Sequence, residues 1–182
     1  MIRRILLNPL LKPILRTLFL WSPRSLSTLV YSAFRSSGDP RVAHFEKAFE
    51  SLENTGSQGD YLEFGAYRGA SFIMASQLAG KYRQESMRFF AFDSFQGLPD
   101  SEGEAFQKGE YQCSREMFTK IIKQSGMDAD KVKIIEGLYE DSLTDSVKSV
   151  YNLDWASIIH MDCDIYTSTK GALQFVEDLV RP

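Results

Sequence analysis

The segment 61–69, Tyr-Leu-Glu-Phe-Gly-Ala-Tyr-Arg-Gly, has residue types that suit a ligand-binding turn. Glu63 lies at the end of an apolar run, and Gly65 and Gly69 follow it. Residues 70–78 have helical composition, which indicates a strand-to-helix turn. Glycine allows a sharp turn and lets a ligand approach closely. The N–H groups at the start of the helix favour a carboxylate, whereas Glu63 would attract a positive group. The turn therefore suits a ligand with both charges, such as the amino-acid part of S-adenosylmethionine; the alternative is a packing turn without a ligand.

A second candidate is Asp93, which follows the apolar run 88–92 and precedes Ser94. Ligands of open α/β sheets lie beyond the carboxyl ends of the strands, so we expect Asp93 beside the first turn, accepting hydrogen bonds from ribose hydroxyls. The alternative is an aspartate that caps a helix or solvates the loop. The 20-residue loop from 93 to 112 favours a binding or lid role. Gly137, after a third apolar run, is expected either to contact an adenine or to form an ordinary turn.

The third candidate is the segment 160–170, in which Asp162 and Asp164 lie at the tip of an apolar run. Two carboxylates so close repel each other unless a cation or solvent separates them, and oxygen ligands of this kind suit Mg²⁺. The alternative is that Asp164 helps to cap the following helix, for which Thr167 or Ser168 is a natural N-cap. His160 is expected to be a hydrogen-bonded strand residue, although it shares a strand face with Asp162 and could also line the pocket.

Composition narrows the class of protein. The 182 residues are enough for one domain with a real core, and the net charge of −3 argues against a general nucleic-acid binder. Cys113 and Cys163 lack metal-type spacing and indicate free thiols in a reducing compartment, so a cytoplasmic location is predicted. The only histidines, His44 and His160, exclude a histidine-rich metal cage.

Residues 1–40 form a predicted basic amphipathic N-terminal arm, closed by the Ser-Ser-Gly-Asp-Pro cluster at 36–40. Residues 1–38 contain six Lys and Arg and no acid, so the remainder carries a net charge of −9. Prolines and cations interrupt the apolar residues, so no stretch approaches the roughly 20 residues that span a bilayer. Three interpretations stay open: a helical cover or dimer arm on the domain, a segment lying on an anionic membrane surface, and an organelle-targeting segment.

Apolar and polar periodicity beyond the arm predicts alternating helices and strands. Such alternation implies a parallel sheet with right-handed crossovers, hence an α/β doubly wound domain over residues 41–182. Strand four would be an open apolar edge, which proteins avoid, so we expect a chain truncated after that strand and its helix. The predicted strands are 60–64, 88–92, 132–135 and 156–161, and the predicted helices are 41–53, 69–81, 113–125 with a stop at Gly126, 139–150 and 168–180.

Three segments together resemble the macrocin O-methyltransferase family of class I S-adenosylmethionine-dependent methyltransferases. They are Leu-Glu-Phe-Gly-Ala-Tyr-Arg-Gly-Ala-Ser at 62–71, Phe-Asp-Ser-Phe-Gln-Gly-Leu-Pro at 92–99, and His-Met-Asp-Cys-Asp-Ile-Tyr-Thr-Ser-Thr-Lys at 160–170. The resemblance covers about 60–180 and implies a Rossmann-like fold that lacks its last strands here. It does not extend to the first 40 residues.

What the resemblance implies is an O-methyltransferase acting on a hydroxyl of a sugar or other small natural product, helped by Mg²⁺. Asp162 matches the position of a metal ligand, with Asp164 nearby, and Asp162 is the residue expected to be catalytic. The residues expected to bind S-adenosylmethionine are Glu63, Gly65, Gly69, Ser71, Asp93, Ser94 and Gly137.

Two other functions are alternatives to this one. The main alternative is a non-catalytic, methyltransferase-like domain that serves as a binding scaffold or as a scaffold associated with a membrane. A nicotinamide-dependent dehydrogenase is disfavoured, because the glycines do not follow G-x-G-x-x-G and Asp93 lies 30 residues beyond Glu63 where about 20 is usual.

Overall fold

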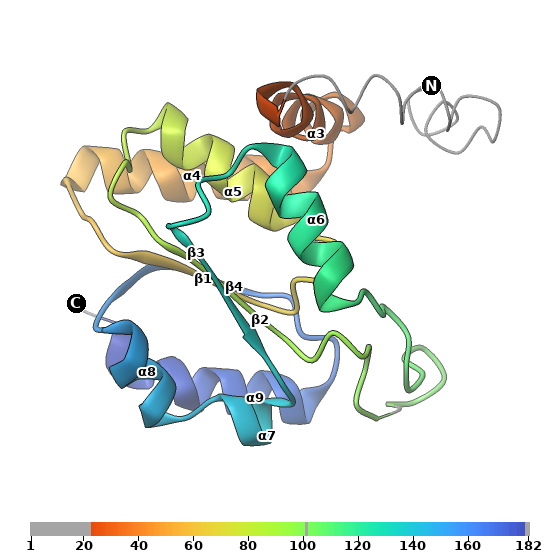
Figure 1. Cartoon of the computed structure of the whole chain (residues 1–182). Coiled ribbons are helices and arrows are strands. Elements are labelled where there is room, and N and C mark those ends of the chain that lie inside the picture. Colours follow the sequence, from red (N-terminus) through yellow and green to blue (C-terminus); the bar gives the residue numbers. More distant parts are fainter. Residues whose placement is uncertain (1–22, 101, 181–182) are drawn as a thin grey trace, which may run out of the picture.

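A parallel sheet of four strands forms the middle layer of the protein, and helices cover both of its faces (Figure 1). The computed structural model describes residues 23–100 and 102–180. The strand order is β3-β2-β1-β4, so the chain builds outward from β1 in one direction and then returns to its other side. The strands are β1 (Asp60–Phe64), β2 (Phe89–Asp93), β3 (Val132–Glu136) and β4 (Ala156–Met161).

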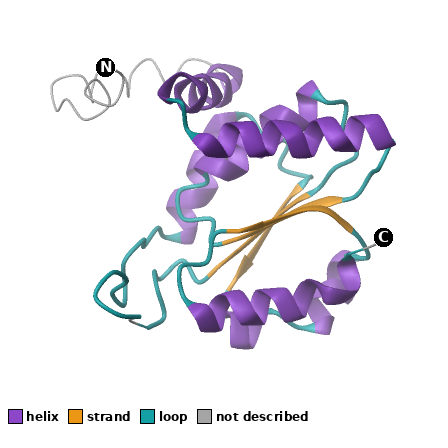
Figure 2. Ribbon diagram, turned by 180° about the vertical axis from the view of Figure 1, so that it is seen from behind, coloured by secondary structure: helices purple, strands orange, loops and turns teal. Residues whose placement is uncertain are grey.

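Helices from the first half of the domain lie on one face of the sheet, and those from the second half lie on the other (Figure 2). This three-layer arrangement is the predicted doubly wound α/β fold, and β4 is at an edge of the described sheet as expected. The first group is α3 (Pro23–Ser37), α4 (Pro40–Thr55), α5 (Ala70–Lys81) and α6 (Arg115–Ser125), and the second is α7 (Tyr139–Ser142), α8 (Asp145–Tyr151), α9 (Tyr166–Val176) and the 3-10 helix η1 (Glu177–Leu179).

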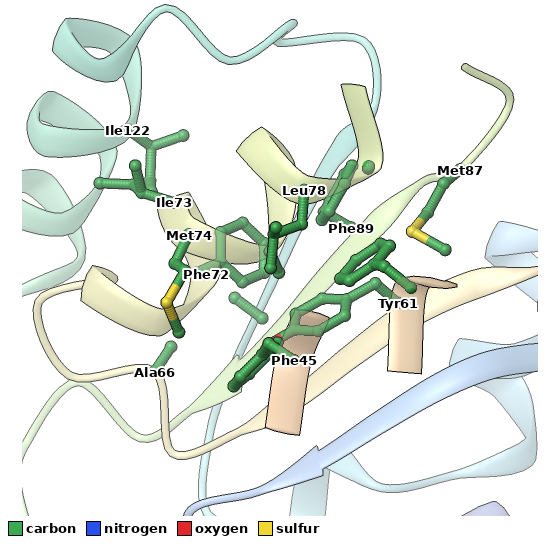
Figure 3. Packing of buried hydrophobic residues seen from close by; sticks show 14 of the residues in the cluster. Phe45, Tyr61, Ala66, Phe72, Ile73, Met74, Leu78, Met87, Phe89 and Ile122 are labelled. Carbon is green, nitrogen blue, oxygen red and sulfur yellow. The ribbon is translucent and has the colours of Figure 1, made fainter. Parts of the chain in front are cut away.

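Alternation along β1 separates two hydrophobic cores. Tyr61 faces α4, α5 and α6, where it packs among Phe45, Phe72 and Phe89 (Figure 3). Leu62 and its alternate neighbours face the other helices instead. Both faces of this central strand are therefore buried, as is usual for parallel sheets.

Local signals in the sequence explain most helix boundaries. Asp39 caps α4 by accepting the N–H of Arg41 at 2.9 Å, and Pro40 occupies the first turn, where no N–H is needed. Ser114 caps α6 in the same manner. Gly126 ends α6 in the left-handed conformation, which confirms the predicted stop.

Two helix predictions were wrong in detail. The helix expected over 139–150 is two helices, because Thr144 takes an extended conformation and caps a new helix through Val147. The last helix begins at Tyr166, so neither Thr167 nor Ser168 is its N-cap. The residue in that position is Ile165, which offers no side-chain acceptor.

The described part of the predicted arm is helix α3, which packs against α5 and α6. Its Tyr31 hydroxyl donates to Glu46 Oε1 of α4 at 2.6 Å, which ties the two helices together. Residues 1–22 lie outside the described residues, so the domain boundary after residue 40 and the membrane and dimer interpretations stay predictions. Within 23–100 and 102–180, no helix is long and apolar enough to cross a bilayer.

Candidate functional site

A cavity of about 300 Å³ lies beyond the carboxyl ends of the strands, where the strand order reverses around β1. Parallel strands bring residues far apart in sequence to this edge, which is where open α/β sheets bind ligands. Three of the predicted site residues, Glu63, Gly69 and Ser71, do not line it. Six do line it: Gly65, Asp93, Ser94, Gly137, Asp162 and Asp164.

Asp93 is held in a fixed orientation at the end of β2. Its Oδ2 accepts the N–H of Tyr67 at 2.9 Å, and its Oδ1 accepts the N–H of Phe95 at 2.7 Å. Both donors have positive φ angles, 45° for Tyr67 and 55° for Phe95, a conformation that costs energy for residues other than glycine. The Asp93 carboxylate therefore stabilises two strained turns while it lines the cavity, and each oxygen keeps lone pairs for a ligand.

Gly65 is needed because the backbone of β4 approaches it closely. Its φ angle is +88°, and a Cβ there would overlap the carbonyl oxygen of Asp162. This glycine was expected to allow a ligand to approach, whereas its described neighbour is the backbone of Asp162, directly after β4. The close approach places Asp162 directly beside the turn that follows β1.

Gly69 begins α5 on the side that faces α6. A Cβ on Gly69 would lie 2.9 Å from Phe118 Cε2 and 3.1 Å from Ile122 Cδ1, so α6 packs directly over this glycine. Ser71, in the first turn of α5, is also buried. Neither Gly69 nor Ser71 lines the described cavity, although the start of α5 was expected to receive a carboxylate.

Glu63 is completely buried behind the cavity wall. Ser71 Oγ donates to its Oε1 at 2.8 Å, and the Tyr61 hydroxyl donates to its Oε2. Burial raises the pKa of Glu63 to about 7, although these hydrogen bonds and the adjacent His160 counteract the effect. Glu63 was expected to meet the ligand, but in the described structure its side chain is buried and hydrogen-bonded to Tyr61 and Ser71.

His160 lies opposite Glu63 on the neighbouring strand β4. Its ring packs edge-on against Phe45, with centroids 4.9 Å apart. The Nε2 atom is buried with no hydrogen-bond partner among the described residues, and it lies 3.8 Å from Asp162 Oδ2, beyond hydrogen-bond range. Burial lowers the pKa of His160, but the carboxylates of Asp162 and Glu63 outweigh it and the net shift is upward.

The two aspartates after β4 differ in their electrostatics. The adjacent His160 imidazole lowers the pKa of Asp162, whereas partial burial and then the charge of Asp162 raise the pKa of Asp164. Both side chains are exposed at the cavity. Among the described residues, no three His, Cys, Asp or Glu side chains are grouped so that they could hold a metal ion. The segment after β4 therefore offers two carboxylates to a cation, those of Asp162 and Asp164.

The loop expected to have a binding or lid role is ordered by its own hydrogen bonds. Leu98 N donates to Glu110 O and Gly109 N donates to Leu98 O, each at 2.9 Å. Glu102 Oε2 accepts the N–H of Tyr166 at 2.7 Å, which fastens the loop to the start of α9. Since Gly97, Leu98, Pro99 and Tyr111 line the cavity, the loop forms one of its walls.

Sequence reasoning missed three cavity residues with functional side chains. Tyr67 and Tyr111 meet at right angles with centroids 5.9 Å apart. Arg41 reaches the cavity from α4, which precedes the predicted methyltransferase motifs. The Asp-Pro pair at 39–40 signals where this helix starts, but the direction of Arg41 depends on how α4 packs on the sheet.

The fold of this site is shared by solved methyltransferases. The chain superposes on the O-methyltransferase NovP with a TM-score of 0.63 and 21% identity, covering 77% of this chain and 60% of that one. It superposes on the calicheamicin methyltransferase CalS11 with a TM-score of 0.67 and 16% identity, covering 78% and 60%. This chain thus spans about 60% of the length of either structure.

Two curated relatives are O-methyltransferases from Streptomyces and Micromonospora. One is 24% identical over 193 residues, 91% of this chain and 71% of the relative: the 8-demethyl-8-(2,3-dimethoxy-alpha-L-rhamnosyl)-tetracenomycin-C 4'-O-methyltransferase of Streptomyces olivaceus. The mycinamicin III 3''-O-methyltransferase of Micromonospora griseorubida is 25% identical over 148 residues, 75% of this chain and 56% of the relative. The profile of the family Macrocin-O-methyltransferase (TylF) matches residues 29–182, which extends the similarity into α3. The resemblance in the three motifs is thereby confirmed: the chain belongs to the macrocin O-methyltransferase family and has the class I methyltransferase fold.

Proposed function

We propose that the protein transfers a methyl group from S-adenosylmethionine to a hydroxyl of a sugar or of another small natural product. The observation that carries the proposal is the cavity at the strand ends, which the oriented Asp93 carboxylate lines together with Gly65 after β1 and Asp162 after β4. Membership of the family supports the reaction class. The sugar O-methyltransferases among the relatives support a small, hydroxyl-bearing acceptor.

The arrangement of strand ends suggests how the donor would lie. Asp93 would accept hydrogen bonds from the ribose hydroxyls, with Ser94 beside it. Gly137, at the end of β3, would border the adenine, and Gly65 would border the methionyl part. Glu63, Gly69 and Ser71 lie behind the wall and would shape the turn without direct contact.

The reaction needs two molecules held in line more than it needs covalent chemistry from the protein. The acceptor oxygen would attack the methyl carbon, the carbon–sulfur bond would break with its electron pair left on sulfur as S-adenosylhomocysteine, and the hydroxyl proton would pass to water. Alignment in the cavity would supply much of the rate. Asp162 lies at the cavity with a lowered pKa, so it is ionised near neutral pH and could accept a hydrogen bond from the attacking hydroxyl.

Assistance by Mg²⁺ belongs to the same proposal. The described donor set is two carboxylates, which fits an ion that keeps several of its waters and does not fit an all-protein cage. Asp162 and Asp164 would hold the ion, which when bound would lower the pKa of an acceptor hydroxyl. Asp162→Asn should abolish any dependence of methyl transfer on Mg²⁺, and an unchanged dependence would reject Asp162 as a ligand.

Calorimetry with S-adenosylhomocysteine tests donor binding. We expect binding to the wild type and a loss of at least about tenfold in affinity for Asp93→Ala, because hydrogen bonds to a charged group contribute about 1.5–3 kcal/mol. A folded wild type that does not bind would remove the methyltransferase proposal. Binding without transfer to any sugar acceptor would favour the non-catalytic scaffold.

Contact of the basic N-terminal segment with a membrane surface is a separate proposal. It is supported by the six cations and no acids of residues 1–38. Co-sedimentation with anionic liposomes, with and without that segment, tests it. Loss of sedimentation on deletion would support the contact, and equal sedimentation would reject it.

A further inference from the structure

The wall of the cavity has an uneven distribution of charge. Asp93, Asp162 and Asp164 contribute three carboxylates. Arg41 contributes the one cationic side chain that the described residues place in that wall. A ligand group attracted by the aspartates is positive, so Arg41 marks the place where a negative group of the same ligand would be stabilised.

Arg41 is oriented by residues on either side of the α3–α4 junction. Its Nε donates to Asp39 Oδ1 at 3.1 Å and its Nη2 donates to Asp39 Oδ2 at 2.9 Å. Its guanidinium lies 5.1 Å from the centre of the Phe34 ring. Asp39 therefore takes two of the five N–H donors of the guanidinium and fixes its plane, while three donors stay available.

The position of Arg41 follows from the packing of α4. Phe45, one turn further along the same helix, packs on His160 near the end of β4. The hydrogen bond to Asp39 raises the pKa of Arg41. The charges of Asp162 and Glu63, near the ends of β4 and β1, raise it to a smaller degree. The charges of both carboxylates thus act on the guanidinium, and Gly65, the first residue after β1, lines the same cavity as Arg41.

Gly69 and Ser71, at the start of α5, do not line this cavity. Phe118 and Ile122 of α6 pack over Gly69, and Ser71 is already donating to Glu63. An α-carboxylate in this cavity would therefore find a cationic side chain on α4, at Arg41.

We propose that Arg41 binds the α-carboxylate of the methionyl part of S-adenosylmethionine. This inference rests on the proposed function and adds the residue that recognises the amino-acid end of the donor. With Asp93 at the ribose, the two charged side chains would hold opposite ends of one ligand across the cavity. The N-terminal helices would then complete the donor site instead of only covering the domain.

Comparing two ligands separates this role from general effects on folding. S-Adenosylhomocysteine has the carboxylate, whereas 5'-methylthioadenosine has the same nucleoside and sulfur but no amino-acid part. For Arg41→Gln in the full chain, calorimetry should show about 10- to 100-fold weaker binding of S-adenosylhomocysteine, as expected when a charge-assisted hydrogen bond is lost. Binding of 5'-methylthioadenosine should stay within about twofold, which also shows that the variant is folded.

Two further variants act as matched controls. Arg35→Gln removes an arginine of α3 that pairs with Glu46 outside the cavity wall, and it should change neither affinity. Asp39→Asn keeps an N-cap for α4 but loses the charge pair that orients Arg41, so it should weaken only S-adenosylhomocysteine, by severalfold.

The outcomes of this comparison are distinct. A selective loss for the ligand with the carboxylate supports the role of Arg41. An equal change for both ligands, or no change for either, overturns that role and leaves the proposed function standing. A folded wild type that binds neither ligand removes the proposed function and this inference with it.

Discussion

Glu63 and Asp93 are acidic residues near the carboxyl ends of neighbouring strands, yet they have opposite environments. Glu63 is completely buried, with a pKa raised to about 7 by that burial. Asp93 lines the cavity and accepts two backbone N–H groups. The register explains the difference, because Glu63 lies beside Ala91, two residues before Asp93 along the sheet. An acidic residue must pass the end of the strand before its carboxylate can meet a ligand.

The face of the strand also matters. Side chains alternate along β1, so Glu63 shares a face with Tyr61, under α4 and α5. A carboxylate at this depth is stable only with donors beside it, and Tyr61 and Ser71 provide them. Glu63 therefore contributes to the shape of the turn, while Asp93 is the carboxylate that the cavity presents.

The largest expected effect is on the stability of the fold, and it comes from Gly65, the first residue after β1. Gly65→Ala should destabilise the fold by about 4 kcal/mol, because its Cβ would overlap the Asp162 carbonyl and its φ angle is +88°. Urea denaturation measures the loss. Gly38→Ala is the matched control, since Gly38 has a φ angle of +68° and nothing within 4 Å of a Cβ. A similar loss in both variants would show that conformation alone, without the close approach, requires Gly65.

A somewhat smaller effect is expected from the pH dependence of stability. The pKa of Glu63 is raised from 4.5 to about 7, so the unfolded chain loses this proton first as the pH rises. Stability should therefore fall between about pH 4.5 and 7, by about 3 kcal/mol. His160 acts in the same direction, because its raised pKa gives stability that is present at low pH and lost as the imidazole deprotonates.

The variant Glu63→Gln measures how much the buried Glu63 carboxyl contributes to the pH dependence of stability. A glutamine stays neutral, so urea denaturation of this variant across pH 4.5 to 8 should give a flatter curve than the wild type. His160 would contribute to the remaining slope, with a smaller upward shift of its pKa because the charge of Glu63 is one cause of that shift. A curve with an unchanged slope would mean that Glu63 keeps an ordinary pKa in the folded protein.

Much of this molecule could be predicted from its sequence. The four strands lie within one residue of their expected bounds, because short apolar runs between turn residues leave little choice. The edge of the sheet that carries the site followed from the parallel order alone. Six of nine candidate site residues line the described cavity for that reason.

The remaining features depend on tertiary packing. The burial of Glu63 requires the register between β1 and β2. The entry of Arg41 into the cavity requires the packing of α4 across His160. The closed start of α5 requires α6, whose contact with Gly69 is separated by about 50 residues in the chain. None of these is encoded in a local motif.

Ligand affinity should distinguish the two carboxylates directly. Asp93→Asn should weaken the binding of S-adenosylhomocysteine about tenfold, because the amide would present an N–H₂ group where two lone pairs are needed. Glu63→Gln should change that affinity by less than about threefold, since Glu63 does not line the cavity. Calorimetry at one pH measures both. Equal losses would contradict the distinction between a cavity carboxylate and a core carboxylate.

The smallest effect concerns the carboxylate of Glu102, which belongs to the loop whose residues Gly97, Leu98, Pro99 and Tyr111 line the cavity. Glu102 Oε2 accepts the N–H of Tyr166 at 2.7 Å, and a negative charge at the start of α9 is favoured by the helix dipole. Glu102→Gln keeps an acceptor but loses the charge, so amide hydrogen exchange at Tyr166 should become about two- to fivefold faster. Glu104→Gln, in the same exposed loop, is the control and should leave that amide unchanged. Faster exchange in the Glu102 variant alone would show that the Glu102 carboxylate helps to hold the loop against the start of α9. Equal rates would mean that the backbone hydrogen bonds of Leu98 and Gly109 are enough to hold the loop in place.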